Sequence, residues 1–216
     1  MPFSRKALLV LALGAVSAHA ADEMEEVIVT ADFRQTELMR SAASVSVLGE
    51  LEIQERGAQH LEEVLSAAPN VSWSTGASRS RFIQMRGVGD LEQYAEPKYY
   101  PAVGVVVDDL ELGSAANAGM LFDVSQVEVL RGPQGTRYGA SAHAGMIKIN
   151  SNKPTDTFEA QLSGGAGSYD SYRYGVIFSG PLGETVNGRI ALQQNKGDGF
   201  MRNRAVGRDD TSGYDE

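Results

Sequence analysis

The feature that most constrains this sequence is a glycine-rich turn between two short β-rich runs. The runs are Val127–Leu130 and Met146–Asn150. Three glycines and a proline crowd the start of the connection: Gly132, Pro133, Gly135 and Gly139. Glycines this close together indicate a chain that turns tightly beside another backbone. The sequence therefore predicts two strands whose connection packs closely against neighbouring main chain.

A charged residue, Arg131, stands where this turn begins. A guanidinium group costs too much free energy to bury without a partner. Arg131 is therefore predicted to pair with a carboxylate, and the alternative is an arginine on an exposed loop.

Helical and strand patterns are mixed in the region before the turn. The expected elements are a strand over 45–48, a short acidic helix ending before Gly57, an amphipathic helix over 59–68 ended by Pro69, and strands over 71–73, 82–86 and 103–108. This mixture predicts the α+β class, with a small mixed sheet and short helices.

The pattern changes after Pro154. Apolar and polar residues alternate in three successive runs: Phe158–Ser163, Tyr172–Ser179 and Arg189–Gln193. Each run has one apolar and one polar face, and its length approaches the roughly 10 residues of a tilted membrane strand. This favours the first antiparallel strands of a transmembrane β-barrel, although a soluble antiparallel sheet would show the same alternation.

The N-terminus has the form of a secretory signal peptide. Arg5 and Lys6 precede an apolar run over 7–18, and Ala18-His19-Ala20 offers small residues for cleavage after Ala20. The run is shorter than the roughly 20 residues of a membrane-spanning helix. Removal of residues 1–20 leaves 17 basic residues against 28 acidic ones and moves the net charge from −9 to −11. This charge disfavours a nucleic-acid partner.

The residue types that carry catalysis are scarce. The sequence has no cysteine, and the two histidines beyond the signal segment, His60 and His143, stand apart from any recognisable catalytic motif. The glycine-rich turn lacks the Gly-Lys-Ser/Thr ending of a phosphate-binding loop. Asp108 and Asp109 are adjacent, and neighbouring strand residues point to opposite faces, which disfavours a shared metal ion. We therefore predict no enzymatic activity, no cofactor and no metal site.

Three motifs resemble, in order and spacing, those of the plug domain of TonB-dependent outer-membrane receptors. They are Ile83-Gln84-Met85-Arg86-Gly87, the run Gly104–Asp108, and the run Val127–Asn150. The resemblance implies structural roles for Asp108, Glu128, Gly132, Pro133, Gly135, Tyr138, Gly139 and Gly145. Asp109 and Ala144 depart from the family by replacing common glycines. Asn150-Ser151-Asn152 replaces a more usual strand end and is expected to shorten that strand.

An acidic tail over 21–39 contains a short β-branched run, and it resembles the TonB-box segment of the same family. The box would consist of Glu26, Val27, Ile28, Val29, Thr30 and Ala31. Such an extended segment can add to a partner sheet as an edge strand. The resemblance implies that the partner is TonB with its inner-membrane energising complex. The short interval between Ala20 and Glu26 predicts a transporter without the family's signalling domain.

The resemblance also implies roles in contacts with the barrel and the ligand. Arg86 and Arg131 occupy positions whose arginines pair with barrel glutamates in the family. Three long connections, 74–81, 89–101 and 113–119, are candidate ligand loops. Their candidate residues are Ser78, Arg79, Tyr94, Tyr99, Tyr100 and Asn117. The tyrosine-rich loop is equally suited to packing on its own domain or on a barrel wall.

The predicted organisation is a signal peptide over 1–20, a flexible TonB-box segment over 21–39, a plug domain over 40–154, and three barrel strands with the start of a loop over 155–216. A plugged barrel needs about 22 strands, so the barrel is predicted to be incomplete in this chain, and 197–216 to be a loop without its return strand. The expected function is energy-coupled uptake of a scarce nutrient across the outer membrane, whose lipid would be in contact with the barrel. A ferric siderophore is the default cargo, with cobalamin and oligosaccharide as other options. The alternative is a truncated, soluble periplasmic plug remnant that binds without transporting.

Overall fold

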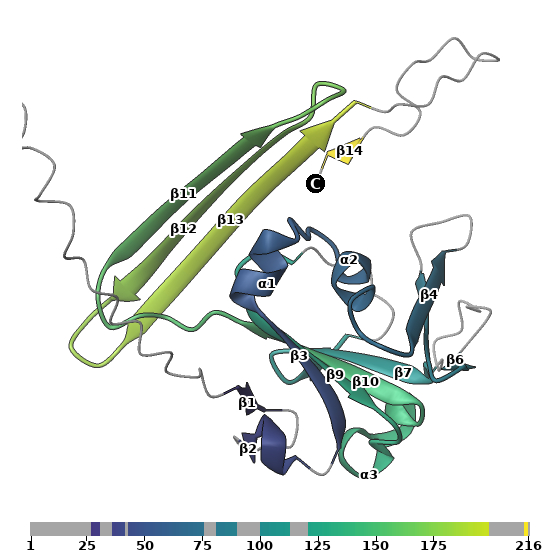
Figure 1. Cartoon of the computed structure of the whole chain (residues 1–216). Helices are drawn as coiled ribbons and strands as arrows, with labels where there is room; N and C mark the ends of the chain where they lie inside the picture. Colours follow the sequence, from purple (N-terminus) through teal and green to yellow (C-terminus); the bar gives the residue numbers. More distant parts are fainter. Residues whose placement is uncertain are drawn as a thin grey trace, which may run out of the picture.

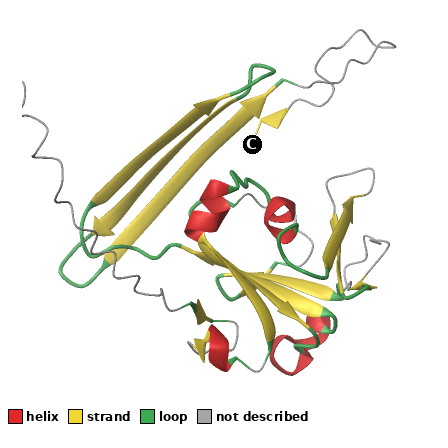
Figure 2. Cartoon of the chain, viewed as in Figure 1, coloured by secondary structure: helices red, strands yellow, loops and turns green. Residues whose placement is uncertain are grey.

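The computed structural model describes residues 27–30, 36–41, 43–75, 81–89, 100–112, 121–198 and 214–215. The chain forms a mixed sheet with short helices, followed by a separate sheet of long strands (Figure 1). The helices gather around the mixed sheet (Figure 2). The predicted α+β class is confirmed.

The central sheet has five strands in the order β3–β9–β10–β7–β8. Their bounds are β3 Ser44–Gly49, β7 Val103–Val107, β8 Leu110–Glu111, β9 Val124–Arg131 and β10 Gly145–Ser151. Strand β10 runs parallel to β7 and antiparallel to β9. The two strands that flank the glycine-rich turn therefore lie side by side in the middle of the sheet.

Two short helices, α1 (Glu50–Glu55) and α2 (Leu61–Leu65), cover one face of this sheet. The Glu63 carboxylate accepts hydrogen bonds from the backbone N–H groups of Gln59 and His60 at 2.5 and 3.2 Å. It thereby satisfies donors around the start of α2 that helix geometry leaves unpaired. The core beneath the helices includes Leu61, Val64, Leu65, Val105, Val127, Val129 and Ile147. Among the described residues, no helix is both long and apolar enough to cross a membrane.

The opposite face of the central sheet carries the alternate residues of the same strands, because successive side chains point to opposite sides. A smaller apolar cluster on this face contains Val29, Val106, Leu130, Ala142 and Met146. It is covered by β1 (Ile28–Val29), β2 (Thr36–Glu37), η1 (Leu38–Arg40), α3 (Gly135–Tyr138) and η3 (Gly139–Ala142). Figure 1 shows β1, β2 and α3 on the side of the sheet away from α1 and α2.

A small antiparallel sheet adjoins the central one. It consists of β4 (Val71–Thr75), β5 (Arg81–Met85) and β6 (Val88–Gly89). The side chains of Ile83 and Met85 are buried in the core beneath the helices. Strand β5 therefore fixes this sheet to the rest of the domain.

The long-strand sheet is antiparallel and contains β11 (Glu159–Ala166), β12 (Tyr172–Pro181), β13 (Asn187–Gly197) and β14 (Tyr214–Asp215). On β12, Gly175, Ile177 and Ser179 are buried, whereas Tyr174 and Phe178 are exposed. The predicted alternation is thus present, with the buried side of the sheet facing the helix-covered domain.

Three local expectations were wrong. Strand β7 ends at Val107, and Asp108 lies in the turn that follows it. Strand β10 continues to Ser151, because a register shift between Asn150 and Ser151 lets pairing with β9 persist. The region after β13 does contain a return strand, since Tyr214 pairs with Gly197 in β14.

Candidate functional site

The predicted TonB box is docked on the face of the central sheet opposite α1 and α2. Strand β1 within it pairs with β2, and the Val29 side chain is 1% exposed among the residues of the smaller apolar cluster. Val27 and Ile28 are 41% and 37% exposed. One side chain of the segment is therefore inserted and its neighbours face outward. Glu26 and Ala31 lie outside the described residues.

Thr30 connects the box to a buried carboxylate on β9. Its backbone N–H donates to both oxygens of Glu128, at 2.9 and 3.1 Å, and its hydroxyl donates to Glu128 Oε1 at 2.7 Å. Glu128 is fully buried. Each hydrogen bond to a charged group of this kind contributes about 1.5–3 kcal/mol. The motif glutamate thus holds the box segment from the middle of the sheet.

Three further polar side chains complete this contact. Gln126 Nε2 donates to Ile28 O at 3.1 Å, Asn150 Nδ2 donates to Thr30 Oγ1 at 3.1 Å, and Lys148 Nζ donates to Thr30 O at 3.4 Å. Gln126 and Asn150 also donate to Glu128 Oε1, at 2.7 and 2.9 Å. We call the four residues Gln126, Glu128, Lys148 and Asn150 the box latch. Sequence reasoning identified only Glu128; polar residues at alternate positions of two strands were the available signal for the others.

The turn between β7 and β8 supports the latch. Asp109 Oδ1 accepts from Lys148 Nζ at 2.6 Å, and Asp108 accepts from the backbone N–H and hydroxyl of Ser151 at 2.8 and 2.6 Å. Both aspartates have positive φ, 46° and 68°, a conformation that Asp tolerates better than most residues. The departure from the family glycine at Asp109 therefore preserves the turn and gives Lys148 a charge partner.

The motif glycines have different roles. Gly132 and Gly139 have φ of 113° and 69°, which is a region that favours glycine. A Cβ at Gly145 would meet Met85 Sδ and would lie 2.6 Å from Leu130 O, so a close approach requires this glycine. Gly135 starts α3 with open space around it, and nothing in the structure explains a glycine there. Pro133 is exposed beside Gly132.

Tyr138 packs against the apolar cluster into which Val29 inserts. Burial, together with the negative charges of Asp109 and Glu128, raises the pKa of its hydroxyl group to about 12. The neutral tyrosine is therefore the form that this side of the sheet stabilises.

The two motif arginines lie close together at the other end of β9. Arg131 Nη1 donates to Pro69 O at 3.0 Å, and a Cβ at Gly132 would lie 3.7 Å from Arg86 Nη1. Arg131 Nε is buried without a hydrogen-bond partner. Burial lowers the pKa of Arg131, and the positive charge of Arg86 lowers it further. No carboxylate among the described residues forms an ion pair with either arginine, so the predicted carboxylate partner is not found within them.

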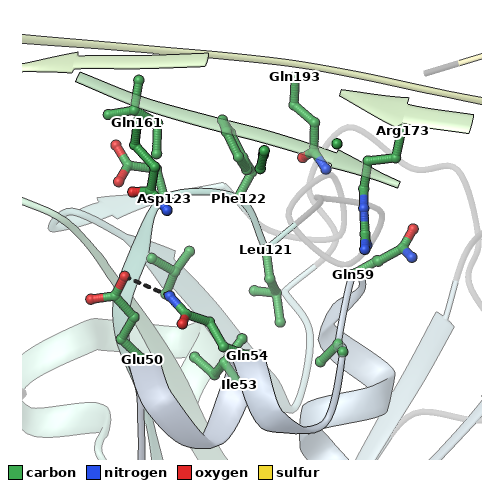
Figure 3. Close-up of a pocket in the computed structure, with 16 residues that line it drawn as sticks. Glu50, Ile53, Gln54, Gln59, Leu121, Phe122, Asp123, Gln161, Arg173 and Gln193 are labelled. Atoms are coloured by element: carbon green, nitrogen blue, oxygen red, sulfur yellow. Dashed lines mark hydrogen bonds between the residues drawn. The ribbon is translucent and has the colours of Figure 1, made fainter. Parts of the chain in front are cut away.

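A different charged pair joins the domain to the long-strand sheet. Asp123, just before β9, binds the guanidinium group of Arg189 on β13, with Nε at 2.7 Å from Oδ2 and Nη2 at 2.5 Å from Oδ1. Asp123 also lines a cavity of about 260 Å³ between α1 and the long strands. Figure 3 shows Gln161, Arg173 and Gln193 pointing into it from the strands, opposite Gln54 and Gln59. Sequence reasoning missed this pair, because its members are 66 positions apart without a shared motif.

The predicted ligand-loop residues are mostly outside the described ranges. Ser78, Arg79, Tyr94, Tyr99 and Asn117 fall there, whereas Tyr100 is described and is 61% exposed. No cluster of metal-binding side chains occurs in the part of the chain that the structure describes.

Comparison with known proteins agrees with this geometry. Residues 37–146 match the family model described as the TonB-dependent receptor plug domain. The pesticin receptor of Yersinia pestis is 33% identical over 201 residues, which are 91% of this chain and 29% of that protein. The vitamin B12 transporter BtuB of Photobacterium profundum is 28% identical over 97% of this chain and 35% of its own length.

A solved structure gives the same result. The ferric yersiniabactin uptake receptor FyuA from Yersinia pestis superposes with a TM-score of 0.73 and 33% identity, over 80% of this chain and 27% of its own. The chain thus spans about a third or less of the relatives it matches. The match to the plug model covers half of the chain and includes the first two motifs and the third as far as Met146, and the family is one of receptors rather than enzymes. The chain belongs to the TonB-dependent receptor family.

Proposed function

We propose that this chain forms the plug and the first wall strands of an outer-membrane receptor that imports a scarce nutrient with energy supplied through TonB. The observation that carries the proposal is the docked box: Val29 is buried, while Val27 and Ile28 are exposed at the edge of the domain. Residues 1–20 would direct export, 21–39 would carry the box, 40–154 would form the plug, and 155–216 would begin the barrel. An exposed β-branched strand can pair with a partner sheet and transmit a pull along its backbone.

The exposed residues of the long-strand sheet support a wall that faces lipid. Its outward face carries large apolar side chains, namely Leu162, Tyr174, Phe178, Ile190 and Leu192, and each is at least 47% exposed. Exposed apolar faces of this kind mark contact with a membrane or another protein. The inward face carries Gly175, Ser179 and Asn195, which suit a wet interior. A soluble plug remnant would leave the outward apolar face in water.

A ferric siderophore is the proposed cargo. The support is the 33% identity to a receptor whose published name is the ferric yersiniabactin uptake receptor. Cobalamin is the competing cargo, because a vitamin B12 transporter is 28% identical. Purified receptor carrying this chain should bind ferric yersiniabactin more tightly than cobalamin in a fluorescence-quenching titration. Tighter binding of cobalamin would reverse the choice of cargo.

Arg86 and Arg131 remain the proposed lock between plug and barrel. Their proximity and the unpartnered, buried Arg131 Nε support a site that needs carboxylates from elsewhere in the receptor. Barrel glutamates would supply both the charge and the hydrogen-bond acceptors.

The TonB contact is tested with backbone variants of the box. Val27→Pro with Val29→Pro removes two backbone N–H donors, whereas Val27→Thr with Val29→Thr keeps both donors and the β-branching. Capture by the periplasmic domain of TonB should fall to background in the proline protein and persist in the threonine protein. Equal capture of both proteins would show that Glu26 to Ala31 is not the TonB box.

A further inference from the structure

The contact between Asp123 and Arg189 is a salt bridge between the plug and the long-strand sheet. The two side chains are 9% and 13% exposed, and both guanidinium contacts go to separate carboxylate oxygens. A bidentate fork of this type fixes direction as well as distance. Asp123 and Arg189 therefore hold one plug loop at a defined position along β13.

Neighbouring groups hold Asp123 in place for this role. Asn152 Nδ2 donates to Asp123 Oδ1 at 3.0 Å, and the Asn152 backbone N–H donates to Asp123 O at 3.0 Å. Asp123 has φ of 59°, so two separate bonds from Asn152 maintain an uncommon backbone conformation. The carboxylate is thus oriented before it meets the guanidinium group.

An aromatic contact lies beside the ion pair. A Cβ at Gly175 of β12 would lie 2.9 Å from the ring of Phe122, so Phe122 rests on the strand where a side chain is absent. Figure 3 shows Phe122 and Asp123 directed toward the long strands. Close to the same point, the backbone N–H of Thr155 donates to Ser179 Oγ at 2.9 Å, and Ser179 pairs with Arg189 across β12 and β13.

We propose that Phe122 and Asp123, seated on Gly175 and Arg189, form a fixed anchor between plug and wall that stays closed while TonB pulls the box. Opening the anchor would leave two mostly buried charges without their partners, and an unpaired charge with little access to water is strongly destabilising. Opening the box latch, in contrast, separates the charged side chains of Glu128 and Lys148 from neutral groups of Thr30. The pull therefore moves the box side of the plug while the anchor holds the rest in the barrel. This inference rests on the proposed transport function.

The test uses cross-links in the receptor that carries this chain. This chain has no cysteine, so in a receptor whose other segments also lack free cysteine, Asp123→Cys with Arg189→Cys can be joined by a short, reducible thiol cross-linker. A second protein, Thr30→Cys with Asn150→Cys, is joined across the latch. TonB-dependent uptake of ferric yersiniabactin should continue with the anchor cross-linked and stop with the latch cross-linked. Reduction should raise uptake by the latch protein above that of its own cross-linked form.

A second readout is independent of cargo. A loosened plug opens the barrel, so cells should become sensitive to vancomycin, which intact outer membranes exclude. Asp123→Arg or Arg189→Asp alone should raise sensitivity by about tenfold, the scale of a coupling energy between contacting residues. The two changes together should restore resistance, because the swapped charges pair again.

The outcomes separate the inference from the function on which it rests. Uptake that stops with the anchor cross-linked, while TonB still captures the box, would overturn the fixed anchor. Unchanged vancomycin sensitivity in both single reversals would also overturn it. Failure of the unmodified receptor to take up ferric yersiniabactin would reject the proposed cargo, and the vancomycin comparison would still decide the anchor.

Discussion

Strand β9 is held to its surroundings in two different ways. At its start, Asp123 meets Arg189, and each partner brings a full charge. In its middle, Glu128 meets Thr30, and only the sheet side is charged. Both contacts are partly buried and both join segments far apart in the sequence, so burial alone does not distinguish them.

The difference appears when each contact is separated. After the box leaves, Glu128 keeps its bonds from Gln126 and Asn150 and becomes accessible to water. After the anchor opens, Asp123 keeps Asn152 but Arg189 loses its carboxylate. Desolvated charges that lose their partner destabilise far more than neutral groups that return to water. The placement of charge therefore determines which end of the plug can be released at low cost.

The largest effect is expected from removing one half of the anchor. Arg189→Ala leaves the mostly buried Asp123 carboxylate without its guanidinium partner and should lower the free energy of unfolding by about 3–5 kcal/mol. Urea unfolding of this chain can be followed by the fluorescence of Trp73, its single tryptophan. Thr30→Ala should cost less in the same assay.

The control for this variant removes both charges. Asp123→Ala with Arg189→Ala leaves no unpaired charge and should recover most of the loss. If the losses of unfolding free energy in Asp123→Ala and Arg189→Ala alone sum to the loss in the double variant, the two residues act independently. The contrast between the start and the middle of β9 would then be wrong.

The second effect concerns release of the box. Thr30→Val removes the hydroxyl group that donates to Glu128 and accepts from Asn150, while Thr30→Ser keeps it. With Val29→Cys as a buried reporter, the rate of maleimide labelling should rise about tenfold or more in the valine protein, as expected for losing about 1.5 kcal/mol of docking. Equal labelling rates in the valine and serine proteins would mean that the hydroxyl group does not hold the box.

Local patterns predicted those parts of the fold that depend on neighbouring residues. Leu61, Val64 and Leu65 have helical spacing and form the buried side of α2. The alternation along β12 and the glycines at positive φ around Arg131 were likewise visible in the sequence. In each case, secondary-structure periodicity or steric restriction acts within a few residues.

Contacts between distant segments could not be predicted in the same way. Thr30 and Glu128 are 98 positions apart, and Asp123 and Arg189 are 66 apart. An aspartate before a strand and an arginine within one are common residues in common places. These two residues become partners only because the plug packs against the long strands. The ion pair could therefore be recognised only in the tertiary structure.

The smallest effect is a response to alkaline pH confined to the box side. The folded pKa of Tyr138 is about 12, raised from 10.0, so its contribution to docking is complete below pH 10 and is lost as the pH rises from 10 to 12. Undocking exposes Tyr138 to water and lowers its pKa, so ionisation favours the released box. A fluorophore on Val27→Cys should report this release before circular dichroism detects loss of the sheets. Tyr138→Phe should remove the transition, because phenylalanine keeps the packing and cannot ionise. The same transition in both proteins would assign the alkaline response to another group.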